Sequence, residues 1–270
     1  MLFSESWLRS YINPDLTTDE LCEAMTMAGL EVEEVSSVAP AFSGVVVARV
    51  LSVRDHENSD HLHICQVDVG EGGEPLQIVC GAPNVREGIL VPCAKIGAVL
   101  PGNFTIKKAK MRGEVSMGML CSARELGITE DHTGLWILPE GLTVGEDIRK
   151  ACHLDDKKIE IKLTPNRGDA LSLIGVARDL HAITGAPLTL PEMPDVPANS
   201  DTKIDIKIEA PDLCGRYTTR RIDNLNIHAP TPQWMKDRLE RSGQRSISAL
   251  VDISNYVMLE TGIPTHFSDA

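Results

Sequence analysis

The spacing of apolar residues predicts a capped helix near the start of the chain. Within residues 17–30, TTDELCEAMTMAGL, three apolar side chains recur at helical spacing on one face: Leu21, Met25 and Ala28. Thr17 is suited to be the N-cap, and Glu20, three residues later, completes a capping box. Gly29 is suited to end the helix.

From residue 42 to residue 139 the pattern changes to short β-branched runs separated by Gly, Pro and Asn. These runs are VVVARVLSV, LHICQVDV, LQIVC, ILVPCAKI and LWILP. About five short strands at this spacing predict a small barrel or sandwich.

A second mixed segment follows. The alternating run KKIEIKL predicts a strand, and Thr164-Pro165-Asn166-Arg167 predicts a turn into a helix that Asp169 caps and Gly185 ends. The apolar side expected for that helix comprises Leu171, Ile174, Ala177, Leu180 and Ile183. The Pro-rich stretch LPEMPDVPANS then predicts a linker.

Beyond the linker, TKIDIKIEA and RYTTRRID are strand-like, TPQWMKDRLERSG is helix-like, and ISALVDISNYVML is strand-like. A domain that begins near residue 200 needs more chain to close its core, so we expect the sequence to be truncated. We also expect protease to cut first near residues 194–201 and then to erode the C-terminal piece.

Composition indicates a cytoplasmic multi-domain protein. The chain has 270 residues, is 42% hydrophobic and contains no run near the roughly 18 apolar residues that cross a bilayer. Its N-terminus lacks a small-residue cleavage site, so we expect neither export nor anchoring. Seven cysteines with no CxxC pair argue against a disulfide framework and a zinc knuckle.

The net charge argues against binding to RNA, but the charge is unevenly distributed along the chain. The chain carries 26 basic and 39 acidic residues, a net −13. The stretch FTIKKAKMRG nevertheless holds four cations and no acid: Lys107, Lys108, Lys110 and Arg112. Strand alternation predicts that the last three line one side, with Ile106, Ala109 and Met111 facing inward. Lysines that protect an edge strand from aggregation are the alternative explanation.

Two other groups of residues invite a chemical role. His56, His61 and His63 lie near Asp60, but no carboxylate cluster at a characteristic spacing accompanies them, so we expect no metal site. Cys80 and Cys121 have strand-like apolar neighbours, which indicates small buried side chains and not nucleophiles.

Four blocks in order, HENSDHLHICQVDVG, IVCGAPNV, IGAVLPG and IKKAKMRGEVSMGMLCS, resemble the OB-fold tRNA-binding module of several aminoacyl-tRNA synthetases. The resemblance implies a five-stranded barrel whose face and loops contact tRNA. Members of this module family usually have Pro and Lys at the positions where this chain has Glu57 and His61, so the loop of this chain has one cation fewer. Few aromatic residues accompany the barrel, which predicts electrostatic binding more than base stacking.

The segments on both sides of these blocks resemble the β subunit of bacterial phenylalanyl-tRNA synthetase. They are SESWLRSYINP, MAGLEVEEV, IEIKLTPNRGDALSLIGVARDL, RYTTRRI and APTPQWMKDRLERSGQRSISALVDISNYVMLETG. The implied fold class is α+β and multi-domain, with the OB barrel inserted into an α/β domain and followed by the start of an α/β editing domain. The expected boundaries are 1–39 with 152–190 for the discontinuous N-terminal domain, 40–151 for the OB domain, 191–200 for the linker, and 201–270 for the partial editing-like domain.

By the same resemblance, Asn255 and His266 fall where the family has residues that line the pocket for hydrolysing tyrosyl-tRNA. ATP and Mg²⁺ are implied for the complete enzyme, and tRNA and an α subunit, in a heterotetramer of two α and two β subunits, are the implied partners. The chain contains no GxxxxGK[ST] loop, so we assign it no catalytic residue for aminoacylation. A freestanding tRNA-binding protein and a stand-alone deacylase of mischarged tRNA remain the alternatives.

Overall fold

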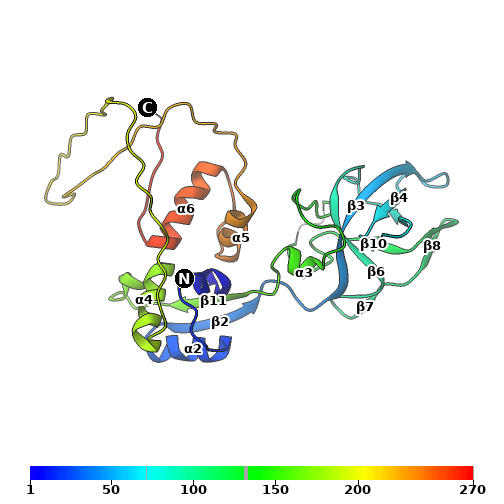
Figure 1. The fold of residues 1–270 in the computed structure, drawn as a ribbon, viewed down its shortest axis with the longest axis horizontal. Helices are drawn as coiled ribbons and strands as arrows, with labels where there is room; N and C mark the ends of the chain where they lie inside the picture. Colours follow the sequence, from blue (N-terminus) through cyan, green and yellow to red (C-terminus); the bar gives the residue numbers. More distant parts are fainter. Residues whose placement is uncertain (71, 131–132, 270) are drawn as a thin grey trace. The chain divides into compact units, whose positions relative to one another are not determined.

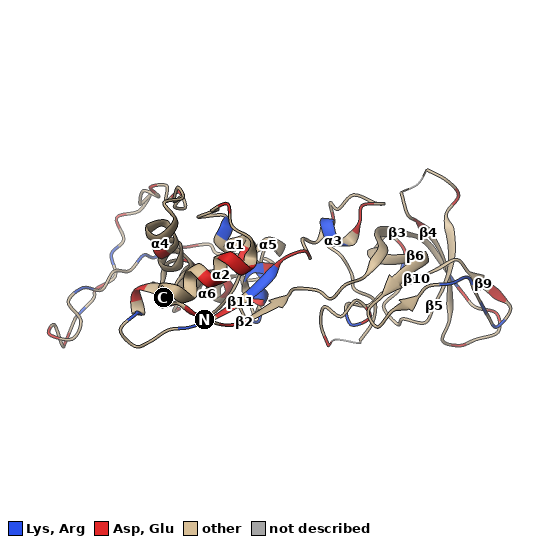
Figure 2. Cartoon of the chain, turned by 90° about the horizontal axis from the view of Figure 1, so that it is seen from below, with Lys and Arg blue, Asp and Glu red and all other residues tan. Residues whose placement is uncertain are grey.

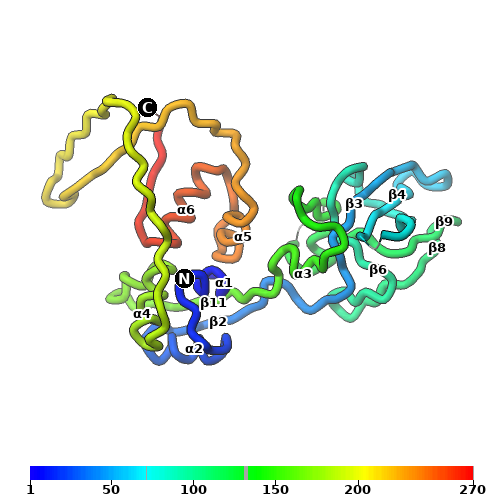
Figure 3. The backbone as a smooth tube through the Cα atoms, in the orientation of Figure 1, coloured from blue at the N-terminus to red at the C-terminus, as the bar shows by residue number. Residues whose placement is uncertain are grey.

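The computed structural model describes residues 1–70, 72–130 and 133–269, which form two compact units. Unit 1 comprises Met1–Glu34 and Ile159–Ala270, and unit 2 comprises Val35–Lys158. The backbone therefore leaves unit 1 once and returns to it once, as the coloured tube in Figure 3 shows.

Unit 1 is built on a three-stranded sheet of order β1-β11-β2 (Figure 1). Its strands are β1 (Leu2–Ser4), β11 (Lys157–Lys162) and β2 (Glu31–Ser37), of which β2 and β11 run into unit 2 at one end. Its helices are α1 (Glu5–Arg9), α2 (Thr18–Met27), the 3-10 turn η1 (Gly168–Ala170), α4 (Leu173–Thr184), α5 (Gln233–Arg241) and α6 (Ala249–Thr261).

The helix predicted from the first apolar repeat is confirmed as α2. Thr17 is its N-cap, and the side chain of Glu20 accepts a hydrogen bond from the Thr17 backbone at 2.8 Å, which completes the capping box. Leu21 and Met25 are fully buried, and Gly29 follows the helix with a φ of 91°, a conformation that glycine adopts without strain.

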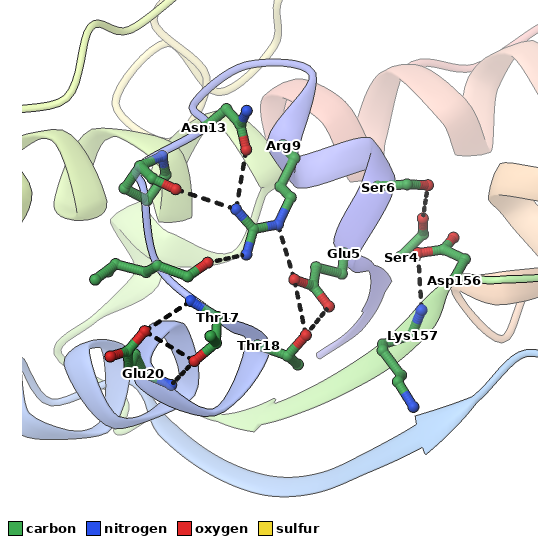
Figure 4. A network of polar contacts seen from close by, with 12 residues as sticks. Ser4, Glu5, Ser6, Arg9, Asn13, Thr17, Thr18, Glu20, Asp156 and Lys157 are labelled. Atoms are coloured by element: carbon green, nitrogen blue, oxygen red, sulfur yellow. Dashed lines mark hydrogen bonds and ion pairs between the residues drawn. The ribbon is translucent and has the colours of Figure 1, made fainter.

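Arg9 fixes the turn between α1 and α2 (Figure 4). Its guanidinium donates to Glu5 at 2.8 Å, to Asn13 at 2.9 Å and to the backbone carbonyl of Leu16 at 2.7 Å. Glu5 also accepts from the hydroxyl of Thr18 at 2.9 Å. A half-buried ion pair thus satisfies backbone carbonyls that the turn leaves without partners.

The helix after the TPNR turn begins later than the sequence predicts. Ser172, and not Asp169, is the N-cap of α4, and its hydroxyl accepts from the Gly175 backbone at 3.0 Å. Asp169 instead lies in η1 and pairs with Arg167. Leu171 and Ile183 are consequently exposed, whereas the predicted inner residues Ile174, Ala177 and Leu180 are buried. The prediction that Gly185 ends the helix is confirmed by its φ of 70°.

The segment ISALVDISNYVML is a helix, so the prediction of a strand there is wrong. It forms α6, which begins after Ser248 and ends at Gly262, whose φ is 80°. Asp252 and Tyr256, four residues apart, are its buried positions, which is helical and not strand periodicity. The strand-like runs within 203–223 form no helix or strand in the part of the chain that the structure describes.

One core holds unit 1 together, and it draws on both ends of the chain. Met235, Leu239 and Tyr256, from α5 and α6, pack in the same buried cluster as Trp7 of α1 and Leu180 of α4. The two C-terminal helices thus share a hydrophobic core with the first thirty residues.

Unit 2 is a curled antiparallel sheet of order β10-β6-β3-β4-β5, with β7 paired to β6. Its elements are β3 (Ser43–Asp55), β4 (His63–Asp68), β5 (Leu76–Cys80), β6 (Leu90–Leu100), β7 (Phe104–Thr105), β10 (Gly118–Leu120), the separate hairpin β8 (Ala109–Met111) and β9 (Glu114–Ser116), and the helix α3 (Ile148–Ala151).

The curl comes from the long strand β3, whose register shifts between Ser43 and Val45 and again between Val50 and Ser52. Its side chains alternate between two cores, with Val45 and Val47 on one side and Val46 and Ala48 on the other. The outer edges of the sheet approach each other, because Met117 donates its backbone N–H to the Gln77 carbonyl at 2.8 Å.

Four of the five predicted strands of this unit are confirmed as β3, β4, β5 and β6. The fifth, LWILP, is not a strand, since it contributes only an isolated bridge between Leu138 and Leu90. The short strand β10 takes that place beside β6, because Gly118 allows close approach: a Cβ there would lie 2.8 Å from the Ala94 carbonyl oxygen.

Candidate nucleic-acid interface

The four predicted cations lie on and just before the β8–β9 hairpin. Lys107 and Lys108 precede β8, Lys110 is its central residue, and Arg112 opens the two-residue turn into β9. Arg112 and Gly113 both have positive φ, 47° and 103°, which is the backbone of the tight turn that suits a twisted hairpin. The structure therefore brings all four cations into one short stretch.

All four cationic side chains are exposed. In the described parts of the chain, Lys107, Lys108 and Lys110 make no hydrogen bond or ion pair, while Arg112 donates to the backbone carbonyl of Asn58 at 2.9 Å. Their neighbour Glu114 is engaged elsewhere, with Arg54 at 3.5 Å and the Gln77 amide at 3.0 Å. Figure 2 colours these basic and acidic positions along the chain.

The expected inward set is only partly right. Ile106 is buried and Ala109 half-buried, but the side chain of Met111 is 40% exposed. Among the described residues, β8 pairs with β9 in a separate two-stranded sheet, and neither hydrophobic core of unit 2 includes Met111. Lys107 and Lys108 also precede the strand, so strand alternation does not govern their directions.

The loop of residues 56–62 lies against this hairpin. The backbone N–H of His56 donates to the Leu62 carbonyl at 3.0 Å and closes the loop. His56 itself is buried, and its Nε2 lies 3.1 Å from the carbonyl oxygen of Met111. Sequence reasoning missed this contact, because nothing in the spacing of the histidines distinguishes a buried ring from an exposed one.

His56 and His63 have partners other than a metal ion. His63 lies 3.2 Å from the carboxylate of Asp55, and the His56 ring contacts backbone groups of Asn58 and Met111. Within residues 1–70, 72–130 and 133–269, no three His, Cys, Asp or Glu side chains are grouped so that they can hold a metal ion.

Several motif residues that sequence reasoning left unassigned hold the fold of unit 2. The Asn84 side chain pairs with both backbone groups of Leu135, at 2.8 and 3.0 Å, as a neighbouring strand would. The Ser116 hydroxyl accepts from the Val79 backbone at 3.0 Å and donates to the Gly118 carbonyl at 2.9 Å. These bonds join the hairpin to β5 and fasten the segment around Leu135 to residue 84.

Cys80 and Cys121 are buried, which confirms that they are core residues. Burial raises the pKa of both thiols, so that neither forms a thiolate readily near neutral pH. Among the helices of the described residues, none combines the length and the apolar character that crossing a membrane requires.

Comparison with known proteins shows what this region and the rest of the chain are similar to. Residues 45–147, which include the hairpin and the loop, match the family model described as "Putative tRNA binding domain". Along all of its residues, the chain is 58% identical to the phenylalanine–tRNA ligase β subunit of Bordetella parapertussis and 59% identical to that of Cupriavidus pinatubonensis. The β subunit of Burkholderia pseudomallei is 58% identical, again over 100% of the chain.

All 270 residues of this chain align with phenylalanine–tRNA ligase β subunits. It spans about a third of the length of these relatives, 33% of the Bordetella and 34% of the Cupriavidus β subunit. A second family model, the B3/4 domain, matches residues 213–270 and thus covers α5 and α6.

The two residues carried over from the β-subunit family lie close together along the C-terminal segment. Asn255 is half-buried on α6, and His266 is exposed beyond its end. The hydroxyl of Ser254 donates to the carbonyl of Thr265 at 2.6 Å, so the residues that precede Asn255 and His266 are in direct contact.

Proposed function

We propose that this chain is a tRNA-binding region of a phenylalanine–tRNA ligase β subunit, which supports the ATP-dependent aminoacylation of tRNA(Phe) by an α/β enzyme. The observation that carries the proposal is the exposed hairpin, whose three lysines lack partners among the described residues within the match to a tRNA-binding domain. Unpaired exposed cations release counterions from phosphates without first breaking an internal ion pair.

The chemistry of the surface favours phosphate contact over base stacking. Of the aromatic rings in unit 2, Phe42 is buried and Trp136 half-buried, while Phe104 is 60% exposed. One exposed ring provides a small stacking platform, whereas four exposed cations lie within residues 107–112. We therefore expect binding that depends strongly on salt and weakly on nucleotide sequence.

We propose that the domain boundaries follow the insertion pattern: 1–39 and 152–190 as one α/β domain, 40–151 as an inserted five-stranded OB barrel, 191–200 as a linker, and 201–270 as part of an editing-like domain. The single exit and return of the backbone at unit 2 supports the insertion. The B3/4 match at residues 213–270 supports the last assignment. In that domain we propose that Asn255 and His266 line the pocket.

The complete enzyme is proposed to be a cytoplasmic heterotetramer of two α and two β subunits that uses ATP and Mg²⁺. The residues described in this chain do not fit either group, since no three metal-ligating side chains are grouped and the sequence has no GxxxxGK[ST] loop. We therefore place nucleotide and metal binding outside these residues. ATP would activate the carboxylate of phenylalanine as an adenylate, with pyrophosphate as the leaving group, and this chain would hold the tRNA.

The test is the affinity for a tRNA(Phe) transcript as a function of salt. Four phosphate contacts give a slope of log K against log salt of about −3. Changing Lys107, Lys108, Lys110 and Arg112 to Ala is expected to bring the slope close to zero.

The matched control removes the same number of charges from exposed positions of unit 1: Lys203, Lys207, Arg220 and Arg221. It is expected to leave the slope unchanged. Equal slopes for the two quadruple variants would show that the hairpin lysines only protect an edge from aggregation.

Two alternative functions predict different results in activity and purification experiments. A stand-alone deacylase releases tyrosine from tyrosyl-tRNA without any partner, and a freestanding tRNA-binding protein purifies without an α subunit. Under the proposal, the 270-residue chain alone forms no phenylalanyl-tRNA from ATP, phenylalanine and tRNA, and it hydrolyses no tyrosyl-tRNA. Intact mass of the native protein and of what purifies with it separates the three cases.

A further inference from the structure

A buried histidine joins the hairpin to the neighbouring loop. The His56 side chain is 3% exposed, although the loop residues that follow it, Glu57 and Asn58, are exposed. Its Nδ1 accepts from the Asn58 backbone N–H at 3.0 Å, and its Nε2 lies 3.1 Å from the Met111 carbonyl oxygen. Polar groups buried to this extent are normally paired, and both ring nitrogens are.

These partners determine where the ring carries its proton. An amide N–H only donates and a carbonyl oxygen only accepts, so Nδ1 must be unprotonated and Nε2 must carry hydrogen. The ring is therefore the neutral Nε2–H tautomer. A protonated Nδ1 would direct a hydrogen at the Asn58 N–H and remove that bond.

Arg112 closes the connection from the other side. Its guanidinium donates to the Asn58 carbonyl at 2.9 Å, while the preceding residue, Met111, accepts from His56. The Asn58 residue thus bonds to His56 through its N–H and to Arg112 through its carbonyl. Three hydrogen bonds, together with the peptide bond between Met111 and Arg112, thus close a ring through His56, Asn58, Arg112 and Met111.

The β9 side of the hairpin is held independently of this ring along its whole length, from Glu114 beside the turn to Ser116 at the base. The Gln77 amide donates to Glu114 at 3.0 Å and to the Val115 carbonyl at 2.9 Å, and Ser116 bonds to β5 through Val79. Loss of the His56 contact therefore frees the β8 side of the hairpin and the turn, where Lys110 and Arg112 lie, and leaves β9 in place. A substitution at His56 can therefore change the position of the cations without disrupting the fold of the sheet.

We propose that His56 is a positioning residue of the RNA-binding surface, which holds the hairpin tip against loop 56–62 so that Lys110 and Arg112 meet phosphates from fixed positions. The inference rests on the proposed function. Only one of the five guanidinium N–H groups of Arg112 is used by Asn58, which leaves donors for a phosphate. Fixing side chains before binding reduces the ordering that binding must otherwise supply.

Two substitutions in the full 270-residue chain each keep one of the two hydrogen bonds of the His56 ring and remove the other. In His56→Gln the amide nitrogen reaches the position of Nε2 and donates to Met111, whereas His56→Asn reproduces only the acceptor near Asn58. We expect His56→Asn to weaken binding of a tRNA(Phe) transcript roughly threefold to tenfold. His56→Gln is expected to recover most of that loss.

Two further measurements separate positioning from general stability. Imidazole ¹⁵N shifts of the unchanged chain should show the neutral Nε2–H tautomer at pH 7, and amide exchange in His56→Asn should rise at residues 110–113 but not in β3 or β6. A different tautomer, or equal RNA affinity of His56→Asn and the unchanged chain, would overturn the inference.

Comparing His56→Asn with the quadruple alanine variant also separates the role of His56 from the proposed function in tRNA binding. If the quadruple alanine variant loses affinity but His56→Asn does not, the cations bind RNA and His56 does not position them. If the quadruple variant binds as tightly as the unchanged chain, the proposed function fails, and the role of His56 in RNA binding fails with it.

Discussion

Trp7 stacks on Tyr256, with ring centroids 4.8 Å apart and ring planes 20° from parallel. The Tyr256 hydroxyl accepts from Arg238 at 2.7 Å and donates to Glu260 at 3.1 Å. Arg238 also lies over the Trp7 ring, 5.2 Å from its centroid. Residues from near both ends of the sequence thus form one aromatic and cationic contact.

Tyr256→Ala is expected to destabilise unit 1 by about 3–5 kcal/mol, because it removes a buried ring together with its hydrogen bonds. Tyr256→Phe keeps the stack and is expected to cost about 1 kcal/mol. Urea unfolding measures both values. The control is Tyr217→Ala, since Tyr217 is 57% exposed and the same change there should cost little. An equal loss at both tyrosines would contradict an anchoring role for Tyr256.

Limited proteolysis is expected to cut between residues 191 and 232, where the structure describes no helix or strand. From the sequence alone, we expected the whole C-terminal piece to erode after that cut. The burial of Met235 and Leu239 in the core of unit 1 changes this expectation for the unmodified chain.

The nicked halves should elute together in gel filtration and separate only in denaturant, with α5 and α6 identified by mass in the C-terminal fragment. Tyr256→Ala should release that fragment after the same cut. Digestion of α5 and α6 at the rate of the linker would show that their packing is too weak to hold them.

Asp252 is expected to make the stability of unit 1 depend on pH. This fully buried carboxylate accepts from the hydroxyls of Thr231 and Ser246 and from the Ile247 backbone N–H at 2.9 Å. Burial alone would raise its pKa, but these hydrogen bonds and the charge of Lys236 hold the pKa below its ordinary value.

A lowered pKa in the folded state contributes stability at neutral pH, which is lost as the pH falls below the ordinary aspartate pKa of roughly 3.9. Asp252→Asn should cost about 2 kcal/mol at pH 7. The difference between this variant and the unchanged chain should shrink in urea unfolding as acid is added. The exposed Asp205→Asn should show no such trend, and a pH-independent cost at Asp252 would exclude a role for its charge.

His61→Lys is expected to strengthen tRNA binding, because it adds a cation to the exposed part of loop 56–62. One added phosphate contact steepens the salt slope by about 0.7–0.9. His153→Lys makes the same change at another exposed histidine of unit 2 and should leave the slope unaltered. If both substitutions raise affinity equally, net charge and not the position of the loop governs binding.

The elements that the sequence predicted well are those whose signals are local. The capping box of Thr17 and Glu20 is contained in four residues, and the strands β3 to β6 each carry their own β-branched run. The cations of the hairpin were also found from the sequence, because a run of basic residues without acidic ones can be recognised without knowing which residues are buried.

What the sequence did not reveal depends on tertiary contact. The β-branched residues of α6 suggested a strand, but packing against Trp7 through Tyr256 favours a helix. The burial of His56 and the pairing of Asn84 with Leu135 join segments far apart along the chain. No local pattern encodes these partners, so structure was needed to distinguish such residues from exposed ones of the same type.

The two ends of unit 2 meet. The Val38 N–H donates to the Asp156 carbonyl at 3.0 Å, and Lys157 Nζ donates to the hydroxyl of Ser37 at 2.8 Å. Since its entry and exit lie side by side, the length of chain between them adds little to the entropy of closing the host fold around it. Unit 2 is therefore a self-contained insertion. We expect that it can be excised and the cut closed with a short turn, or moved as a whole into an exposed loop of an unrelated protein.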